Sequence, residues 1–223
     1  MGKTLNERGS ARAPLYCLLV FVIVTMAVAW IRWFDIPYGS VLIPALWGMG
    51  ALFPLRAADT ALLSLGFTPP QFIKGLKYFI LSSAIVFTLY SGVFYAFLHL
   101  GFTVPAALIV PGPSIFNWII YNFIAVAFFE ELFFRGYLQG RLAEYAKSSF
   151  IGARKVFWLP VVAAAFLFAL AHVAVDLDPA RIAVFFPGLL FGWLRAKTGS
   201  LLAPILSHGS ANLLSMLIIR FML

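Results

Sequence analysis

Charged residues are scarce in this chain, which has 16 Lys and Arg and 8 Asp and Glu among its 223 residues. They make up 11% of the sequence, whereas about 25% is usual for a soluble domain. Hydrophobic residues account for 63%, and the mean hydropathy is +0.98. This composition excludes an ordinary soluble domain. It predicts a helical membrane protein, because the apolar runs are continuous and about twenty residues long.

Cysteine is almost absent, and so are the motifs of several common enzyme classes. Cys17 is the only cysteine, so no intrachain disulfide can form, and we expect its side chain to face lipid or the protein core. The sequence contains no glycine-rich phosphate loop, no paired CxxC and no HExxH zinc motif. The chemistry of the chain must therefore rest on other residues.

Proline, glycine and charged residues divide the chain into about seven hydrophobic segments. They cover roughly residues 15–34, 37–55, 72–99, 115–138, 156–175, 182–196 and 200–220. The pattern predicts an all-α, polytopic membrane bundle that forms a single integral membrane domain over residues 1–223. We expect residues 59–70 to lie at the membrane interface. The first segment lacks a small-residue cleavage site and is too long for a signal peptide, so we expect a retained span.

The formal net charge is +8, but the basic residues lie scattered between the hydrophobic segments and form no stripe of the kind that binds nucleic acid. Alternate loops differ in basic content, as the positive-inside rule describes for membrane proteins. One set holds twelve basic residues: Lys3, Arg8, Arg12, Arg56, Lys74, Lys77, Arg141, Lys147, Arg154, Lys155, Arg195 and Lys197. The other holds three: Arg32, Arg181 and Arg220. We expect the N-terminus in the cytoplasm and the protein in the cytoplasmic (inner) membrane of a prokaryote.

The fourth hydrophobic segment contains two adjacent carboxylates and an arginine, Glu130, Glu131 and Arg135. A charge at the centre of a membrane helix costs at least about 2.5–3.5 kcal/mol, so ionisable groups there are usually paired and functional. Glu131 and Arg135 have the spacing of a helical ion pair. Glu130 points about 100° away from Glu131 and lacks this partner, which makes it a candidate general base or acid. The alternative is that both acids merely hold neighbouring helices together.

Two later segments each contribute a histidine. Phe168 and His172 share one face of the fifth segment, and His208 and Asn212 share one face of the seventh. Taken alone, His172 is typical of a hydrogen-bonded packing residue, and the other pair is typical of polar contacts between membrane helices. Taken together, three segments that carry polar side chains at a similar depth favour a common site.

The common depth depends on where the fourth helix ends. If that helix continues through residue 146, the turn to the fifth lies near residues 151–152, and Glu130 comes level with His172. His99 ends the third segment without a companion, so we expect it at the membrane interface, outside the site.

These motifs resemble those of the CPBP family, the intramembrane proteases that include CaaX prenyl proteases and Abi-like bacteriocin-processing proteins. The resemblance covers about residues 115–220, which we interpret as a CPBP-like catalytic core. The EExxxR, FxxxH and HxxxN motifs of the family match, in order, Glu130, Glu131, Arg135, Phe168, His172, His208 and Asn212.

The resemblance implies a glutamic-type intramembrane endopeptidase that hydrolyses a peptide bond. It implies that Glu130 activates water with help from His172, and that His208 and Asn212 donate hydrogen bonds to the developing oxyanion. Arg135 would hold Glu131 and the local helix, and Phe168 would support the site. A carboxylate base, a positioned water and preorganised donors are the parts that acyl hydrolysis needs.

A zinc site is an open alternative for the same residues. Glu130, His172 and His208 offer oxygen and nitrogen ligands, and a water could take the fourth position. We favour the mechanism without a metal or another cofactor. In that interpretation Glu131 is explained by Arg135, and Asn212 is a better oxyanion donor than zinc ligand.

Two other classes of protein fit parts of the pattern. Intramembrane Glu, His and Arg residues also serve proton-coupled transporters, although the sequence shows no internal repeat. A non-catalytic binding protein, such as a bacteriocin-immunity protein, would keep the fold without the reaction. For the protease, the partners are the lipid bilayer and a membrane-anchored protein or peptide precursor cut near its C-terminus. Both prenylated and unmodified substrates are compatible with the resemblance.

Overall fold

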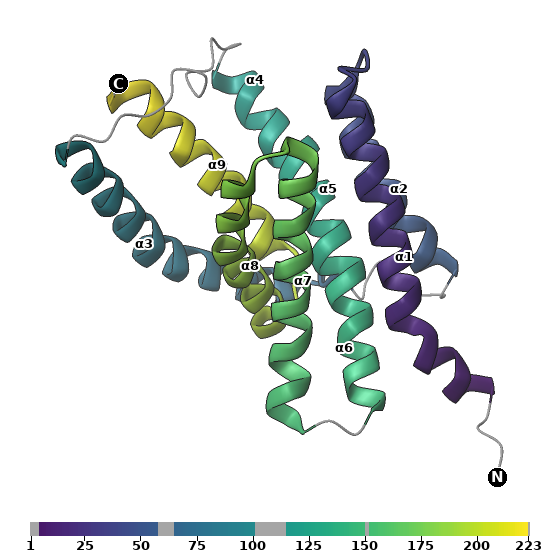
Figure 1. Ribbon diagram of the computed structural model, residues 1–223. Helices are drawn as coiled ribbons and strands as arrows, with labels where there is room; N and C mark the ends of the chain where they lie inside the picture. Colours follow the sequence, from purple (N-terminus) through teal and green to yellow (C-terminus); the bar gives the residue numbers. More distant parts are fainter. Residues whose placement is uncertain (1–4, 58–64, 101–114, 150–151, 223) are drawn as a thin grey trace.

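The computed structural model describes residues 5–57, 65–100, 115–149 and 152–222, which form helices and turns and no strand (Figure 1). These ranges contain seven continuous helical segments. They are α1 (Leu5–Trp33), α2 (Gly39–Ala57), α3 (Pro69–His99), one long helix from Ile115 to Ser148, α7 (Ala153–Asp176), α8 (Phe185–Thr198) and α9 (Leu202–Met222). A 3-10 turn, Pro179–Val184, precedes α8. The predicted all-α class is confirmed.

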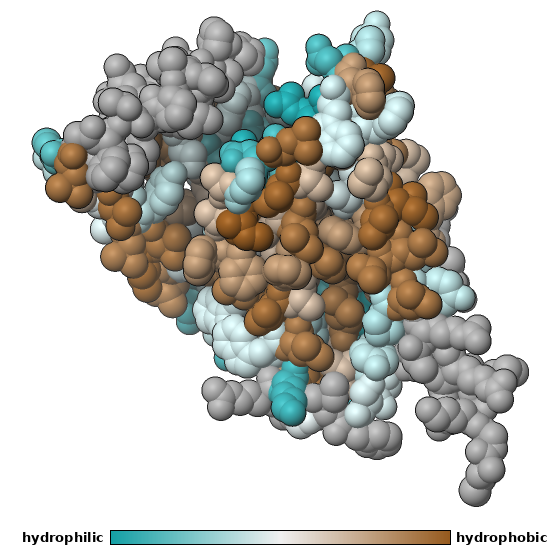
Figure 2. Space-filling model, in the orientation of Figure 1, coloured by the Kyte–Doolittle hydropathy of each residue, from teal (hydrophilic) through white to brown (hydrophobic). Residues whose placement is uncertain are grey.

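Four helices of the described part are long and apolar enough to cross a membrane. They cover Pro14–Trp33, Pro69–Val93, Ile115–Ser148 and Lys155–Asp176. Two shorter apolar stretches, Gly39–Pro54 and Leu202–Ile218, lie in α2 and α9, and α8 has only 14 residues. Hydrophobic side chains cover most of the middle of the face seen in Figure 2. The fold is a helical membrane bundle, and the number of seven crossings stays a prediction.

The long helix extends beyond residue 138, where the sequence placed the end of the span. Its last part, α6 (Gln139–Ser148), continues to a turn before α7 begins at Ala153. The connection between the two helices therefore falls between Ser149 and Gly152, close to the predicted position. The two helices run side by side in Figure 1, which brings the middle of the long helix level with the C-terminal half of α7.

Successive helices run in opposite directions, and this places most of the basic residues at one end of the bundle. The starts of α1, α3 and α7 and the ends of α2, α6 and α8 lie toward the lower end in Figure 1, and we call this the basic end. Eleven of the twelve basic residues of the first loop set belong to these helix ends, and the twelfth, Lys3, lies outside the described residues. The opposite end carries Arg32 and Arg181 together with Asp35 and Asp176.

The long helix departs from α geometry on both sides of the two glutamates. Two π-helical stretches, Tyr121–Ala127 and Leu132–Leu138, flank the four-residue α5 (Phe128–Glu131), and α4 (Ile115–Ile120) precedes them. π turns are rare, and they occur frequently at functional sites. An apolar sequence gives no warning of them, so the simple 3.6-residue period does not describe this helix.

Aromatic packing attaches the N-terminal helices to the long helix. The Trp47 ring of α2 lies 4.9 Å from that of Phe133 and 5.1 Å from that of Phe134. Phe21 of α1 packs edge-on against Phe134 at 6.5 Å. Cys17 is buried in the same core, so its predicted place in the core or against lipid is resolved in favour of the core.

Two glycines allow the turn between α8 and α9 to pack against the chain that precedes α3. Gly66 has a φ of +84° and Gly199 a φ of +70°. A Cβ at Gly66 would lie 1.9 Å from the carbonyl oxygen of Gly199, so no larger residue fits there. The Leu201 N–H donates to the Leu65 carbonyl at 3.1 Å, which ties the turn to the chain that precedes α3. Half of the interfacial segment predicted over 59–70, residues 59–64, lies outside the described residues.

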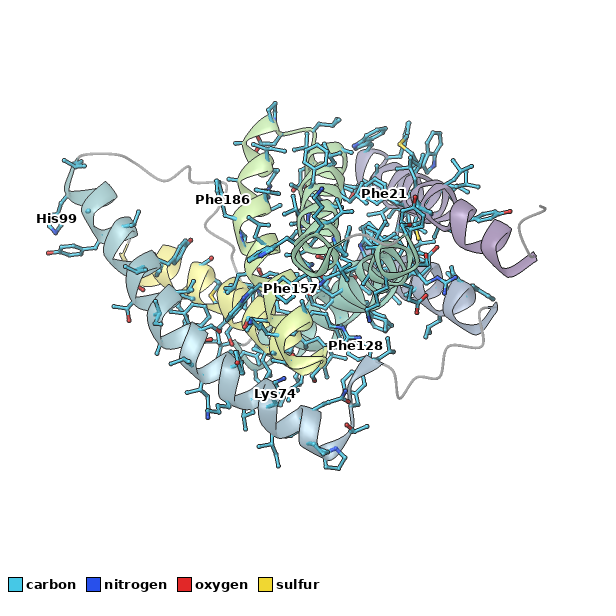
Figure 3. The ribbon with its side chains drawn as sticks, turned by 90° about the horizontal axis from the view of Figure 1, so that it is seen from below. Phe21, Lys74, His99, Phe128, Phe157 and Phe186 are labelled. Atoms are coloured by element: carbon cyan, nitrogen blue, oxygen red, sulfur yellow. The ribbon has the colours of Figure 1, made fainter. Side chains whose placement is uncertain are left out.

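The helix α3 leans away from the rest of the bundle. Seen from below, its far end carries His99 at a distance from the helices α7 and α8 (Figure 3). The exposed His99 ring contacts Tyr95, one turn earlier, with the ring centroids 4.1 Å apart. His99 therefore has an aromatic companion that the sequence did not indicate, but it lies apart from the other histidines.

Candidate active site

A buried ion pair lies at the centre of the bundle. Arg135 Nη1 donates to Glu131 Oε1 at 2.9 Å, and both side chains are fully buried. Arg135 Nη2 donates to the backbone carbonyl oxygen of Gly188 on α8 at 3.0 Å. The structure thus brings together the two residues that the sequence paired. It adds a backbone acceptor that no side-chain pattern could have revealed.

Aromatic rings enclose the guanidinium of Arg135. Its central carbon lies 4.4 Å from the ring centroid of Phe168 and 5.3 Å from that of Phe191. Gly188 permits this close packing, because a Cβ there would lie 3.2 Å from Phe168 Cδ1. Desolvated cation–π contacts of this kind contribute about 2 kcal/mol or more. Phe168 of the FxxxH motif therefore packs against Arg135 of the EExxxR motif.

His208 links this core to the second glutamate. Its Nδ1 lies 2.9 Å from Glu131 Oε1, and an ionised carboxylate only accepts, so Nδ1 carries a proton. The ring stacks on Phe191 with the centroids 5.1 Å apart and an interplanar angle of 15°. This orientation leaves Nε2 facing Glu130, 3.9 Å from Oε2.

Glu130 also faces His172. The two groups approach to 4.0 Å between Glu130 Oε2 and His172 Nε2. His172 Nδ1 lies 2.9 Å from the Phe168 carbonyl oxygen, which only accepts, so this nitrogen is protonated as well. Over the described residues Glu130 Oε2 is buried and has no hydrogen-bond partner. The two gaps are too long for direct hydrogen bonds, but a water about 2.8 Å from each polar atom bridges such a gap.

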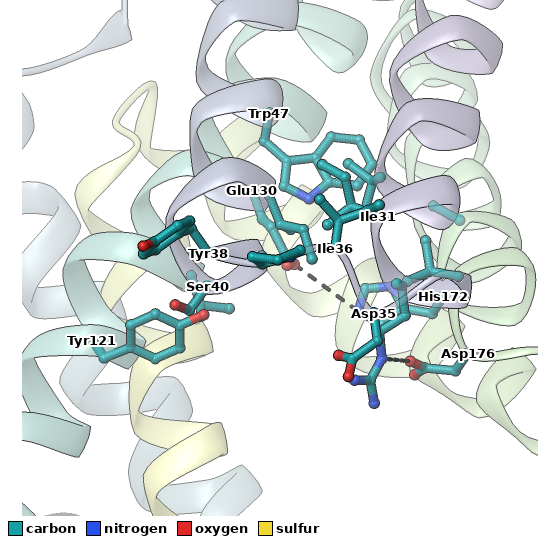
Figure 4. A pocket seen from close by; sticks show the side chains of 18 residues that line it. Ile31, Asp35, Ile36, Tyr38, Ser40, Trp47, Tyr121, Glu130, His172 and Asp176 are labelled. Carbon is teal, nitrogen blue, oxygen red and sulfur yellow. Dashed lines mark ion pairs between the residues drawn. The ribbon is translucent and has the colours of Figure 1, made fainter.

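A cavity of about 740 Å³ opens beside these groups, and we call it the glutamate cavity (Figure 4). Glu130 and His172 face each other in its depth, and their side chains are 13% and 25% exposed. Arg32, Tyr38 and Asp176 line its outer part, at the end of the bundle opposite the basic end. Water and an extended substrate can therefore approach Glu130 from that end.

A comparison with protein-family models agrees with this arrangement. Residues 112–214 match the family described as Type II CAAX prenyl endopeptidase Rce1-like. This region covers slightly less than half of the chain and contains all three motifs. The chain carries a CPBP-family domain. No curated protein and no solved structure matches the chain.

The CPBP domain defines the general class of the protein. It is an integral membrane protein and, in general terms, an intramembrane endopeptidase with a protein substrate in a membrane. The match assigns no roles to individual residues. Their contacts in the structure indicate what each residue can do.

Asn212 has a hydrogen-bond partner that the sequence did not indicate. Its Nδ2 donates to Asn122 Oδ1 at 3.4 Å, and Asn122 donates to the carbonyl of Trp118 at 3.0 Å. Among the described residues the hydrogen-bond partner of Asn212 is thus a carboxamide of the long helix, and not Glu130 or His172. The sequence interpretation missed Asn122. A signal was available, because this amide lies in the same apolar run as the two glutamates.

A zinc site requires its ligand atoms to lie closer to one another than the corresponding atoms of Glu130, His172 and His208 do. Bonds of about 2.0–2.2 Å place tetrahedral ligand atoms about 3.3–3.5 Å apart. The Glu130 oxygen lies 3.9 and 4.0 Å from the Nε2 atoms of His208 and His172. Over the described residues, no three His, Cys, Asp or Glu side chains form a group that could hold a metal ion. This arrangement does not fit a tetrahedral zinc site, and chelation tests the alternative directly.

Proposed function

We propose that this CPBP domain hydrolyses a peptide bond with a water that Glu130 activates. The observation that supports this is the position of Glu130 Oε2 in the glutamate cavity, with the Nε2 atoms of His172 and His208 at 4.0 and 3.9 Å. A water at this point donates one proton toward the carboxylate and presents its lone pair to a carbonyl carbon in the cavity. The general base then takes the proton as the carbon–oxygen bond forms.

The two histidines have complementary parts in this proposal. His172 Nδ1 is held by the Phe168 carbonyl, so the neutral ring accepts at Nε2 and positions the same water. His208 is held by Glu131 at Nδ1, and as an imidazolium it donates from Nε2 to the oxyanion of the tetrahedral intermediate. When the intermediate collapses, the proton on Glu130 passes to the leaving amine.

Asn212 serves as an oxyanion donor only after a change of partner. Its amide now bonds Asn122 at 3.4 Å, a long and weak contact that a substrate carbonyl could replace. Asn122 then remains hydrogen-bonded to the Trp118 carbonyl. Replacing Asn122 by Ala tests this exchange, because it removes the competing acceptor while Asn212 stays in place.

The distribution of basic residues indicates which side of the membrane supplies the substrate. The positive-inside rule places the basic end in the cytoplasm, together with the N-terminus. The glutamate cavity opens at the other end and therefore faces the non-cytoplasmic side. This orientation favours precursor peptides or C-terminal sorting tails that have crossed the membrane over prenylated tails at the cytoplasmic face.

Cysteine labelling tests this orientation. Ser40→Cys lies beside the mouth of the glutamate cavity and Ser149→Cys lies after α6 at the basic end, both exposed and both in a Cys17→Ser background. We expect a membrane-impermeant maleimide to label Ser40→Cys in intact cells and Ser149→Cys only after permeabilisation. The reverse pattern would contradict the proposed orientation and move the substrate to the cytoplasmic side.

The proteolytic function is tested without knowledge of the substrate. Protein termini in membranes from cells that make the wild type or Glu130→Gln are compared by mass spectrometry. We expect new C-termini that depend on Glu130 at equal amounts of the two proteins. Glu144→Gln is the matched control, because Glu144 lies at the basic end and outside the glutamate cavity. Identical termini in the wild type and Glu130→Gln would contradict the proposal.

The same cells separate the alternative functions. A zinc enzyme would lose the Glu130-dependent termini after exhaustive chelation and regain them with zinc, whereas we expect no loss. A transporter would change proton-coupled flux without changing any terminus. A binding protein would keep its phenotype in Glu130→Ala, His172→Ala and His208→Ala.

A further inference from the structure

A second cavity, of about 540 Å³, opens at the basic end of the bundle, and we call it the basic cavity. It lies between the start of α3, the last part of the long helix from Arg135 to Lys147, the start of α7 and the end of α8. Its charged lining consists of Arg135, Arg141, Glu144, Lys147 and Arg195. The glutamate cavity shares none of these residues, and Arg135 is the only motif residue among them.

The lining of the basic cavity has an excess of positive charge. Glu144 is the one carboxylate among its described lining residues, and it accepts from Arg141 at 2.6 Å. This pair leaves the exposed Lys147 and the half-buried Arg195 as additional cations. Arg195 donates to the backbone carbonyl of Gly199, which also lines the cavity. The cavity therefore favours an anion.

Two deeply placed polar groups in the lining lack partners. Arg135 Nε and Gln139 Oε1 are buried, and neither has a hydrogen-bond partner in the part of the chain that the structure describes. The Gln139 amide is fixed, because its Nε2 donates to the Gly192 carbonyl at 2.9 Å. A buried donor or acceptor left without a partner costs about 1–3 kcal/mol. A polar ligand that reaches this depth, or water carried with it, would satisfy both atoms.

Part of the remaining lining is apolar, and this part favours one kind of anion over another. Leu65, Val156, Phe157 and Pro160 line the same cavity as the cations. A free phosphate ion gains nothing from these side chains. A phospholipid, in contrast, places its phosphate among the cations and its acyl chains along the apolar residues.

We propose that the basic cavity binds the headgroup of an anionic phospholipid. The phosphate lies near Arg141, Lys147 and Arg195, and the acyl chains leave over Val156 and Phe157 toward the bilayer. Basic pockets between membrane helices on the cytoplasmic side are typical binding sites for anionic headgroups. The proposal concerns binding only, so it holds or fails independently of the proteolytic mechanism.

Native mass spectrometry of the purified full-length chain tests the proposal, with phosphatidylglycerol as the probe and phosphatidylcholine as the neutral control. We expect one phosphatidylglycerol to be retained preferentially. Each cation near the headgroup contributes about fivefold to affinity, so Lys147→Gln should weaken retention about fivefold and Arg141→Gln with Lys147→Gln about twenty-five-fold. Glu144→Gln should strengthen it, because it removes the competing carboxylate. Unfolding temperatures of all variants establish that they are folded.

Lys77→Gln is the matched control, because Lys77 is an exposed lysine of α3 near the basic end but does not line the cavity. It should change retention less than twofold. Equal retention of the two lipids, or an equal loss in Lys77→Gln and Lys147→Gln, would overturn the proposal. Complete displacement of the lipid by millimolar inorganic phosphate would also overturn it, since it would identify a free phosphate ion as the ligand. Because Lys147 is exposed, its single variant keeps the test valid if the double variant fails to fold.

Discussion

Glu130 and Glu131 are adjacent in the chain, but their side chains lie in two different regions of the molecule. Glu131 is fully buried, and its Oε1 accepts from Arg135 and His208 at 2.9 Å each, while its Oε2 has no hydrogen-bond partner among the described residues. Glu130 borders the glutamate cavity, has no direct hydrogen-bond partner through Oε2 in the described part of the chain, and faces two histidine nitrogens at about 4 Å. A fully buried glutamate that two donors hold stabilises the fold. A glutamate with open space beside it can move a proton.

The largest expected effect is on the free energy of unfolding, which depends on Glu131. Glu131→Gln leaves the buried Arg135 without its charged partner, and breaking a buried pair in this way costs about 3–5 kcal/mol. We expect a large fall in stability, measured by equilibrium unfolding in detergent. Glu144→Gln breaks the exposed pair with Arg141 and should cost no more than about 1 kcal/mol. Equal losses in the two variants would contradict the assignment of Glu131 to the structural core.

Gly209→Ala tests how the residue after His208 packs against the long helix, and its expected loss of stability is of intermediate size. A Cβ at Gly209 would lie 2.6 Å from Phe123 Cδ1 and 2.8 Å from Cγ, so Gly209→Ala must displace the whole ring. Overpacking of this kind typically costs about 1–3 kcal/mol, and we expect a loss of that size by thermal unfolding. Gly140→Ala is the control, because no neighbouring atom lies within 4 Å of a Cβ there. Tolerance of both substitutions would show that α9 is not held against the long helix at this point.

The smallest expected loss of stability concerns the aromatic rings that enclose Arg135 and His208. Phe191 stacks on His208 and covers Arg135, so Phe191→Leu keeps an apolar side chain while it removes the stacking. Aromatic pairs contribute about 0.5–1.5 kcal/mol beyond their buried area, and we expect a stability loss within this range. Unfolding of Phe191→Leu in a His208→Ala background isolates the contact. A loss of the same size there would mean that the His208 ring is not the partner.

The sequence predicts the chemistry of the site better than its geometry. The i,i+4 spacing predicts the Glu131–Arg135 contact, because a short helical interval fixes both side chains. The contact of His208 with Glu131 joins residues 77 positions apart and depends on how α9 packs, which local spacing does not encode. The π-helical stretch Tyr121–Ala127 changes the orientation of Asn122 relative to the glutamates, and no residue pattern predicts this stretch. The sequence therefore did not indicate the contact of Asn212 with Asn122, and the role of Asn212 as an oxyanion donor stays a prediction.

The most direct test of the division between the two glutamates is cleavage per folded molecule. A peptide that spans one of the Glu130-dependent termini is incubated with the purified wild type, Glu130→Gln and Glu131→Gln, and each rate is divided by the folded fraction. A missing general base lowers the rate about 10²–10⁴-fold, so Glu130→Gln should lose activity to this extent while it keeps the wild-type unfolding temperature. Glu131→Gln should lose stability first and should retain the greater activity per folded molecule. Full activity of folded Glu130→Gln would contradict the account.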